Sequence, residues 1–159
     1  MDPSLFETTN GVQYYTYADY AKWNTTERYE LIDGIPYMMA SPSSAHQSIV
    51  FEIGHQLKNL LKDKKCVPFI SPLDVCLNGK NEMDNTVFQP DVFVVCDRSK
   101  IGKNYINGAP DFVVEVLSPS SISRDTTQKM IKYIRVCSII PFCCFFGKFP
   151  VLRNLRKLA

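Results

Sequence analysis

Two apolar runs between residues 86 and 118 constrain the fold most strongly, because each contains one carboxylate. Asp91 precedes the run VFVV at 92–95, and Glu115 lies inside the run FVVEVL at 112–117. Runs of this composition, bounded by Gly, Pro, Asn and Asp, predict β-strands covered on both faces. A carboxylate in such a strand loses hydration worth several kcal/mol, on the order of the penalty for other buried ions, unless positive charge meets it.

Two explanations fit these acids. Each could be salt-bridged or lie at a strand end, as structural acids often do. Alternatively, Asp91 and Glu115 lie on neighbouring strands and share one divalent cation. We favour the shared cation, because both acids have the same kind of setting and a lysine-bearing helix follows directly.

The composition predicts one globular domain of α/β or α+β type. The chain has 159 residues, of which 45% are hydrophobic and 21% charged, enough for a sizeable core. No apolar stretch is long enough to span a bilayer, so we expect no membrane association. The N-terminus lacks the basic and apolar regions of a signal peptide, which predicts a cytoplasmic location.

The cysteines show neither a C-x-x-C pair nor a histidine at metal-binding spacing. A zinc-dependent hydrolase and a disulfide framework are therefore not favoured, and we expect free buried thiols. The six cysteines are Cys66, Cys76, Cys96, Cys137, Cys143 and Cys144.

Local patterns predict a helix at 15–23 and a hairpin whose strands, 28–32 and 35–39, flank Asp33-Gly34. Pro36 indicates that the second of these strands lies at a sheet edge or begins irregularly. Ser44 opens an amphipathic helix with His46 in its first turn and His55 on its solvated face. We interpret His46 as a hydrogen-bonded first-turn histidine rather than a catalyst.

The second half of the chain gives weaker signals. We predict a strand at 66–77, interrupted by Pro68 and Pro72, and a loop at 97–109. A helix is predicted from about Ser123. Its expected inner face is apolar and consists of Met130, Ile131 and Ile134.

Taken together, these segments resemble the bacterial family described as putative restriction endonucleases, within the PD-(D/E)xK nuclease superfamily. The likeness runs from about residue 15 to residue 135. It implies a restriction endonuclease-like core with a mixed central sheet, flanking helices and an N-terminal β-hairpin. The matching segments are YELIDG at 29–34, SP at 41–42 with His46, PLDV at 72–75, QPD at 89–91, GAPDFVVEVLSPS at 108–120, and Arg124-Asp125 leading to Lys129 and Tyr133.

The resemblance implies a metal-dependent enzyme that hydrolyses DNA phosphodiester bonds. Asp91 and Glu115 would be catalytic residues that hold Mg²⁺, with Mn²⁺ as an alternative ion. The family's common lysine position, two residues after the glutamate, is Leu117 here, so the resemblance assigns the lysine to Lys129. Helical geometry alone does not choose between Lys129 and Lys132.

Other features stay open at this point. Lys129 follows Asp125 at i,i+4 spacing, so a surface ion pair is an alternative for that lysine. Glu30, His46 and Asp74 match family segments and could line the cleft. DNA is the expected partner, and a homodimer is a further option because many nucleases of the superfamily act as dimers.

The C-terminal residues 136–159 differ from the family pattern. Residues 1–135 form the predicted domain, whereas the tail is rich in Cys and Phe and contains no acid. Our hypothesis is that a shifted reading frame or a truncation produced this tail and left the sheet edge exposed. A catalytically inactive nuclease-fold protein that binds nucleic acid or a protein partner is therefore the alternative to an endonuclease. A strand at 142–146 would count against the shifted frame.

Overall fold

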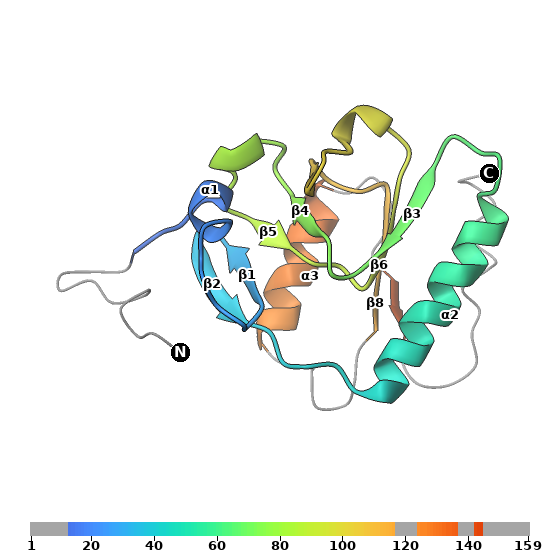
Figure 1. Cartoon of the computed structure of the whole chain (residues 1–159), viewed down its shortest axis with the longest axis horizontal. Helices are drawn as coiled ribbons and strands as arrows, with labels where there is room; N and C mark the ends of the chain where they lie inside the picture. The colour runs from blue at the N-terminus through green and yellow to red at the C-terminus, as the bar shows by residue number, and fades with distance from the viewer. Residues whose placement is uncertain (1–12, 117–123, 137–141, 145–159) are drawn as a thin grey trace.

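The computed structural model describes residues 13–116, 124–136 and 142–144 (Figure 1). Within these ranges, no helix combines the length and the apolar character needed to cross a bilayer. The elements are α1 (Tyr17–Tyr20), β1 (Tyr29–Ile32), β2 (Ile35–Met38), α2 (Ser44–Leu60), β3 (Val67–Ile70), β4 (Asp74–Cys76), η2 (Asn81–Met83), β5 (Val87–Phe88), β6 (Val92–Val95), η3 (Arg98–Lys100), β7 (Tyr105–Asn107), β8 (Phe112–Val116), α3 (Arg124–Val136) and β9 (Phe142–Cys144).

The strands form two mixed sheets. One sheet has the order β2-β1-β5-β4-β7, and the other has the order β3-β6-β8-β9. The pairs β4–β7 and β8–β9 are parallel, and the remaining pairs are antiparallel. The predicted mixed α+β class is thus confirmed, although the single central sheet is divided in two.

The N-terminal hairpin forms as predicted. Strands β1 and β2 pair from Tyr29↔Met38 to Ile32↔Ile35, and the turn places Asp33 at φ 52° and Gly34 at φ 84°. Positive φ at both central residues defines the turn that matches the twist of a two-residue hairpin. β2, which contains Pro36, lies at the edge of its sheet, which is the first of the two alternatives that Pro36 indicated.

Helix α2 covers one face of the four-stranded sheet. Its buried side chains include Val50, Ile53 and Leu57, and they pack against Val92 and Val114 of β6 and β8. The cap of the helix lies one residue earlier than predicted, since the Ser43 side chain accepts a hydrogen bond from the His46 N–H at 3.2 Å. The helix thereby holds His46 at the end of the sheet where β6 begins.

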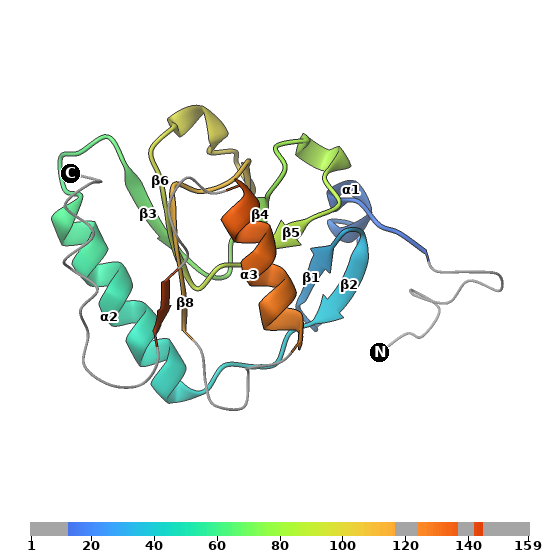
Figure 2. The ribbon, with the colours of Figure 1, turned by 180° about the vertical axis from the view of Figure 1, so that it is seen from behind.

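The opposite face of this sheet is also buried, which explains why its central strands are apolar throughout. Phe93, Val95 and Val113 share a core with residues of the five-stranded sheet, including Phe88, and with Tyr133 of α3. Figure 2 shows α3 in front of this region, between the β1–β2 hairpin and β8. Helix α3 therefore stands where the two sheets meet.

Helix α3 is turned the other way from our prediction. Of the three expected inner residues, Met130 is half-buried, whereas Ile131 and Ile134 are 44% and 62% exposed. Tyr133 is fully buried, and the Lys129 side chain is only 13% exposed. The prediction was wrong because it assumed that the apolar stripe faces the core. This helix instead directs a lysine and a tyrosine toward buried carboxylates.

Two irregular regions contain more structure than expected. Residues 66–77 form β3 and β4, which belong to different sheets. The predicted loop at 97–109 contains η3 and strand β7, whose buried Ile106 pairs with Val75. A strand of three residues cannot be recognised from its own sequence pattern, because it is specified by pairing with its partner strand.

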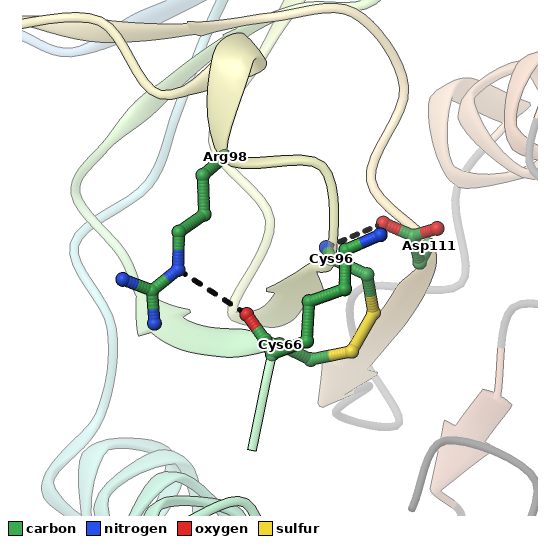
Figure 3. The surroundings of a disulfide bond; sticks show 5 residues. Cys66, Cys96, Arg98 and Asp111 are labelled. Atoms are coloured by element: carbon green, nitrogen blue, oxygen red, sulfur yellow. Dashed lines mark hydrogen bonds between the residues drawn. A yellow bond between two sulfur atoms is a disulfide. The ribbon is translucent and has the colours of Figure 1, made fainter. Parts of the chain in front are cut away.

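The structure contains a disulfide between Cys66 and Cys96, which corrects the expectation of free thiols for this pair (Figure 3). The two cysteines continue the β3–β6 register by one residue beyond Val67↔Val95, so the strands bring them face to face. Asp111 accepts a hydrogen bond from the Cys96 N–H at 2.7 Å beside the disulfide. Cys76 is free and buried, as expected.

Part of the C-terminal tail adds a strand. β9 pairs in parallel with β8, with Val114 opposite Phe142. The edge of β8 that we expected to be open is thus covered over these three residues. The rest of the predicted strand at 142–146, together with 145–159, lies outside the described residues.

The fold predicts that two leucines of α2 contribute unequally to the stability of the protein. Leu57 is 1% exposed and Leu60 is 38% exposed, so Leu57→Ala opens a cavity whereas Leu60→Ala does not. We expect L57A to lower the free energy of unfolding by about 2–5 kcal/mol. The matched control L60A should change it by about 0.5 kcal/mol or less.

Urea denaturation with an unchanged m-value measures both effects. Equal losses for the two variants would contradict the packing of α2 described above.

Candidate active site

The two acids predicted as a pair lie side by side. Strands β6 and β8 pair with Val92 opposite Val114, and continuing this antiparallel register by one residue places Asp91 opposite Glu115. Because side chains alternate along strands, Glu115 lies on the face away from α2, which Val92 and Val114 contact, whereas Asp91 stands directly before β6, where His46 of α2 reaches it. The structure therefore brings together the residues that carried the sequence argument.

Hydrogen bonds hold Asp91 at the head of β6. Its Oδ2 accepts the backbone N–H of Val116 at 2.7 Å, which joins the acid to the strand that contains Glu115. His46 Nε2 lies 3.2 Å from the same oxygen. His46 thus contacts the site from the first turn of α2, and its Nδ1 is buried without a hydrogen-bond partner among the described residues.

Glu115 lies deeper, with 8% of its surface exposed. Its Oε1 accepts a hydrogen bond from the Tyr133 hydroxyl at 3.0 Å and lies 3.0 Å from Lys129 Nζ. Both donors come from successive turns of α3, since residues at i and i+4 share one face of a helix. The helix therefore neutralises a carboxylate that its strand would otherwise leave buried and unpaired.

Burial determines the protonation behaviour of Glu115. Loss of hydration raises the pKa of its carboxyl group to about 7, against an ordinary value of 4.5. The positive charge of Lys129 opposes this rise, and the negative charges of Asp91 and Glu30 add to it. Glu115 is thus a carboxyl group for which additional positive charge would be favourable near neutral pH.

The lysine beside Glu115 is Lys129, which the sequence alone could not separate from Lys132. Lys129 Nζ lies 2.7 Å from Glu30 Oε1 and 5.5 Å from the centroid of the Phe88 ring. Burial lowers its pKa, but Glu115 and Glu30 outweigh that effect and hold it above the ordinary lysine value. Lys129 therefore stays an ammonium ion inside the site.

Lys132 points elsewhere. Its Nζ lies 2.6 Å from both carboxylate oxygens of Asp33, in the exposed hairpin turn. The side chain of Asp125, the alternative partner for Lys129, lies outside the described residues, as does Leu117. Among the described acids, the ion-pair partners of Lys129 are Glu30 and Glu115.

Asp74 lies beside the site and is connected to it through Gln89. Its Oδ1 accepts a hydrogen bond from Gln89 Nε2 at 2.9 Å, and Tyr20 donates to the same oxygen at 3.4 Å. Burial raises the pKa of Asp74. The backbone N–H of Gln89 in turn donates to Glu30 Oε1 at 2.7 Å, so this polar group continues into the environment of the lysine.

Sequence reasoning assigned no role to Tyr133 or Gln89, although both fall in the segments that resemble the family. For Glu30 the sequence predicted only that the residue could line the cleft. The available signal for Tyr133 was its i+4 spacing from Lys129, which places both side chains on one helical face. No local signal showed that β1 would bring Glu30 to this helix, because the contact joins residues 99 apart.

The donor set fits a magnesium ion. Asp91 Oδ1 and Glu115 Oε2 receive no hydrogen bond from the described residues, so each acid keeps one carboxylate oxygen for a ligand. Within the part of the chain that the structure describes, no three His, Cys, Asp or Glu residues cluster as a metal cage. Mg²⁺ typically binds one or two carboxylates and completes its shell with water and substrate phosphate, so two neighbouring acids are enough to hold it.

Comparison with known proteins places this site in context. The family model Uma2, described as a putative restriction endonuclease, matches residues 13–139. A crystal structure of a putative nuclease from Anabaena variabilis is similar, with a TM-score of 0.63 and 19% identity; the match covers 80% of this chain and 72% of that chain. At this identity the likeness shows a common fold. A search of curated proteins found no match.

The raised pKa of Glu115 predicts how stability depends on pH without metal. The unfolded carboxyl loses its proton near pH 4.5 and the folded one near pH 7, so the folded state holds the extra proton in between. The stability that Glu115 contributes is therefore present below pH 4.5 and lost as the pH rises to about 7.

The quantity to measure is the difference in the free energy of unfolding between wild type and Glu115→Gln, by denaturation in EDTA. This difference should change over this pH window by on the order of 3 kcal/mol or less. Glu52→Gln, on the exposed face of α2, is the control and should show no such change. A difference between wild type and E115Q that stays constant from pH 4.5 to 7 would contradict the assignment.

Proposed function

The chain belongs to the Uma2 family of putative restriction endonucleases, and from this premise we propose that it is a Mg²⁺-dependent endonuclease that hydrolyses phosphodiester bonds in DNA. The observation that carries the proposal is the placement of Asp91 opposite Glu115 with Lys129 Nζ 3.0 Å from Glu115. Two acids and an ammonium ion in one partly enclosed site suit phosphoryl chemistry, in which charge develops on the phosphate oxygens.

Asp91 and Glu115 would hold the metal ion in this proposal. Each offers a carboxylate oxygen that is free of hydrogen bonds from the described residues. The bound ion would polarise the scissile phosphate and lower the pKa of the attacking water. The Val116 N–H and the Tyr133 hydroxyl fix the orientation of the two carboxylates, so little rearrangement of the acids is needed when the ion binds.

Lys129 would supply positive charge beside the reacting phosphate and orient the attacking water. Its Nζ is held by two carboxylates and lies over the Phe88 ring, so its position is fixed before substrate arrives. Preorganised charge of this kind stabilises a transition state without reorganisation during the reaction. Lys129 reaches the site from α3, in place of the lysine that related nucleases place on the strand of the glutamate.

His46 would position Asp91. Its ring lies 3.2 Å from Asp91 Oδ2, the oxygen that also accepts the Val116 N–H. These two contacts engage the same oxygen and leave the other free of hydrogen bonds from the described residues. In this arrangement His46 acts through Asp91 and does not touch the substrate.

Nicking of supercoiled plasmid DNA in Mg²⁺ or Mn²⁺ tests the proposal. Asp91→Ala and Glu115→Ala should reduce nicking to background, and EDTA should abolish it, because each removes part of the cation site. Lys129→Met should reduce the rate by on the order of 10²–10³, the usual loss for one preorganised electrostatic donor. Lys132→Met changes a lysine on the same helix that is paired with Asp33, and should leave the rate within about twofold.

Each outcome has a definite meaning. Nicking that survives in both D91A and E115A would not depend on these acids, and it would overturn the assignment of the site. A wild-type protein that is folded by circular dichroism but does not nick would favour a nuclease-fold protein that binds nucleic acid or another partner. A loss in K132M equal to that in K129M would contradict the selection of Lys129.

A further inference from the structure

Glu30 is a buried carboxylate that reaches the site from the other sheet. It lies on β1 and is 8% exposed, whereas Asp91 directly precedes β6 and Glu115 belongs to β8, both strands of the four-stranded sheet. Its neighbour Leu31 packs into the core around α1, so alternation along the strand turns Glu30 toward α3. Glu30 Oε1 then accepts two hydrogen bonds, from Lys129 Nζ and from the Gln89 N–H, both at 2.7 Å.

Lys129 is consequently shared between two acids with different surroundings. Glu115 lies opposite Asp91, where the proposed function places the metal ion, whereas Glu30 is paired with the lysine and a backbone N–H. A divalent cation at Asp91 and Glu115 would repel the ammonium of Lys129, which lies 3.0 Å from Glu115. Without a second acceptor, metal and lysine would compete for Glu115.

Glu30 removes this competition. Two carboxylates, those of Glu115 and Glu30, contact the single ammonium of Lys129, and the carboxylate of Asp91 lies beside that of Glu115. The three acids together exceed the charge of the ammonium by two negative charges. One divalent cation balances this excess. The charge of Glu30 is thus needed if the metal ion and the lysine are to occupy the site together.

We propose that Glu30 is a positioning residue, which keeps the Lys129 ammonium in place when a divalent cation takes the Glu115 carboxylate. This inference rests on the proposed function, because it needs a cation between Asp91 and Glu115. Glu30 acts through Lys129, by its 2.7 Å contact with Nζ, and does not touch the substrate.

A purely structural role makes a different prediction. Glu30 could simply join α3 to the hairpin, as Asp33 does by its pairing with Lys132 at 2.6 Å. Asp33 is therefore a matched control, since Asp33→Asn removes an ion pair between the same two elements without changing the site. Asn also tolerates the positive φ of 52° at this position.

The experiment measures Mn²⁺ affinity directly, by calorimetry and by the electron paramagnetic resonance signal of free Mn²⁺, on the full chain without DNA. Glu30→Gln, which keeps the shape but removes the charge, should weaken Mn²⁺ binding about tenfold or more, as changes in residues around metal ligands do. Asp33→Asn should leave the affinity within about twofold, because an exposed pair contributes little. Glu30→Asp, with the charge retained, should recover part of the loss.

A double-mutant cycle tests whether Glu30 acts through the lysine. In a Lys129→Met background there is no ammonium for Glu30 to hold, so adding E30Q should change Mn²⁺ affinity by about twofold or less. A tenfold effect that persists in this background would overturn the proposal, because Glu30 would then act on the cation directly.

The remaining outcomes separate this inference from the function. Wild-type binding of Mn²⁺ with equal affinity in E30Q would overturn the role of Glu30 and leave the nuclease proposal intact. Absence of Mn²⁺ binding by folded wild type would overturn both. If E30Q does not fold, E30D is used in the same cycle, and it should weaken binding about threefold or more only while Lys129 is present.

Discussion

The contact between Lys129 and two buried carboxylates is the interaction on which the site depends. Strand β8 is buried on both faces, so it can contain Glu115 only if positive charge reaches it from another element. Helix α3 supplies that charge, and Glu30 on β1 completes the pairing. One ammonium group therefore joins the two sheets and the helix, and its removal would leave two acids in a poorly hydrated environment.

This requirement explains the orientation of α3. An amphipathic helix normally turns its apolar stripe toward the core. In α3 the side chains that reach the buried region are Lys129 and Tyr133, while Ile131 and Ile134 lie at the surface. The free energy of pairing buried acids outweighs the burial of two isoleucines at this position, because an unpaired interior carboxylate costs more than an exposed aliphatic side chain.

The sequence predicted the elements whose signal is local. Three features follow from patterns within a few residues: the Asp33-Gly34 turn, the apolar stripe of α2 and the two apolar strands that accompany Asp91 and Glu115. The structure has each of them. What it could not predict depends on pairing between distant segments. The division into two sheets, the short strand β7 and the Cys66–Cys96 disulfide are specified by partner strands, not by local composition. The choice of Lys129 over Lys132 likewise required the positions of Glu30 and Asp33.

The sequence separation within the site has a consequence for biosynthesis. Glu30 and Lys129 touch across 99 positions of chain, and Asp91 and Glu115, the acids of the proposed metal site, lie between them in sequence. During translation the acids emerge first, and the ammonium that pairs with them follows only after α3 has been made. Because segments emerge from the N-terminus onward, the contacts of Lys129 with Glu30 and Glu115 form late in synthesis. A partly synthesised chain therefore lacks the ion pairs of this site, and the polypeptide acquires them only when α3 docks.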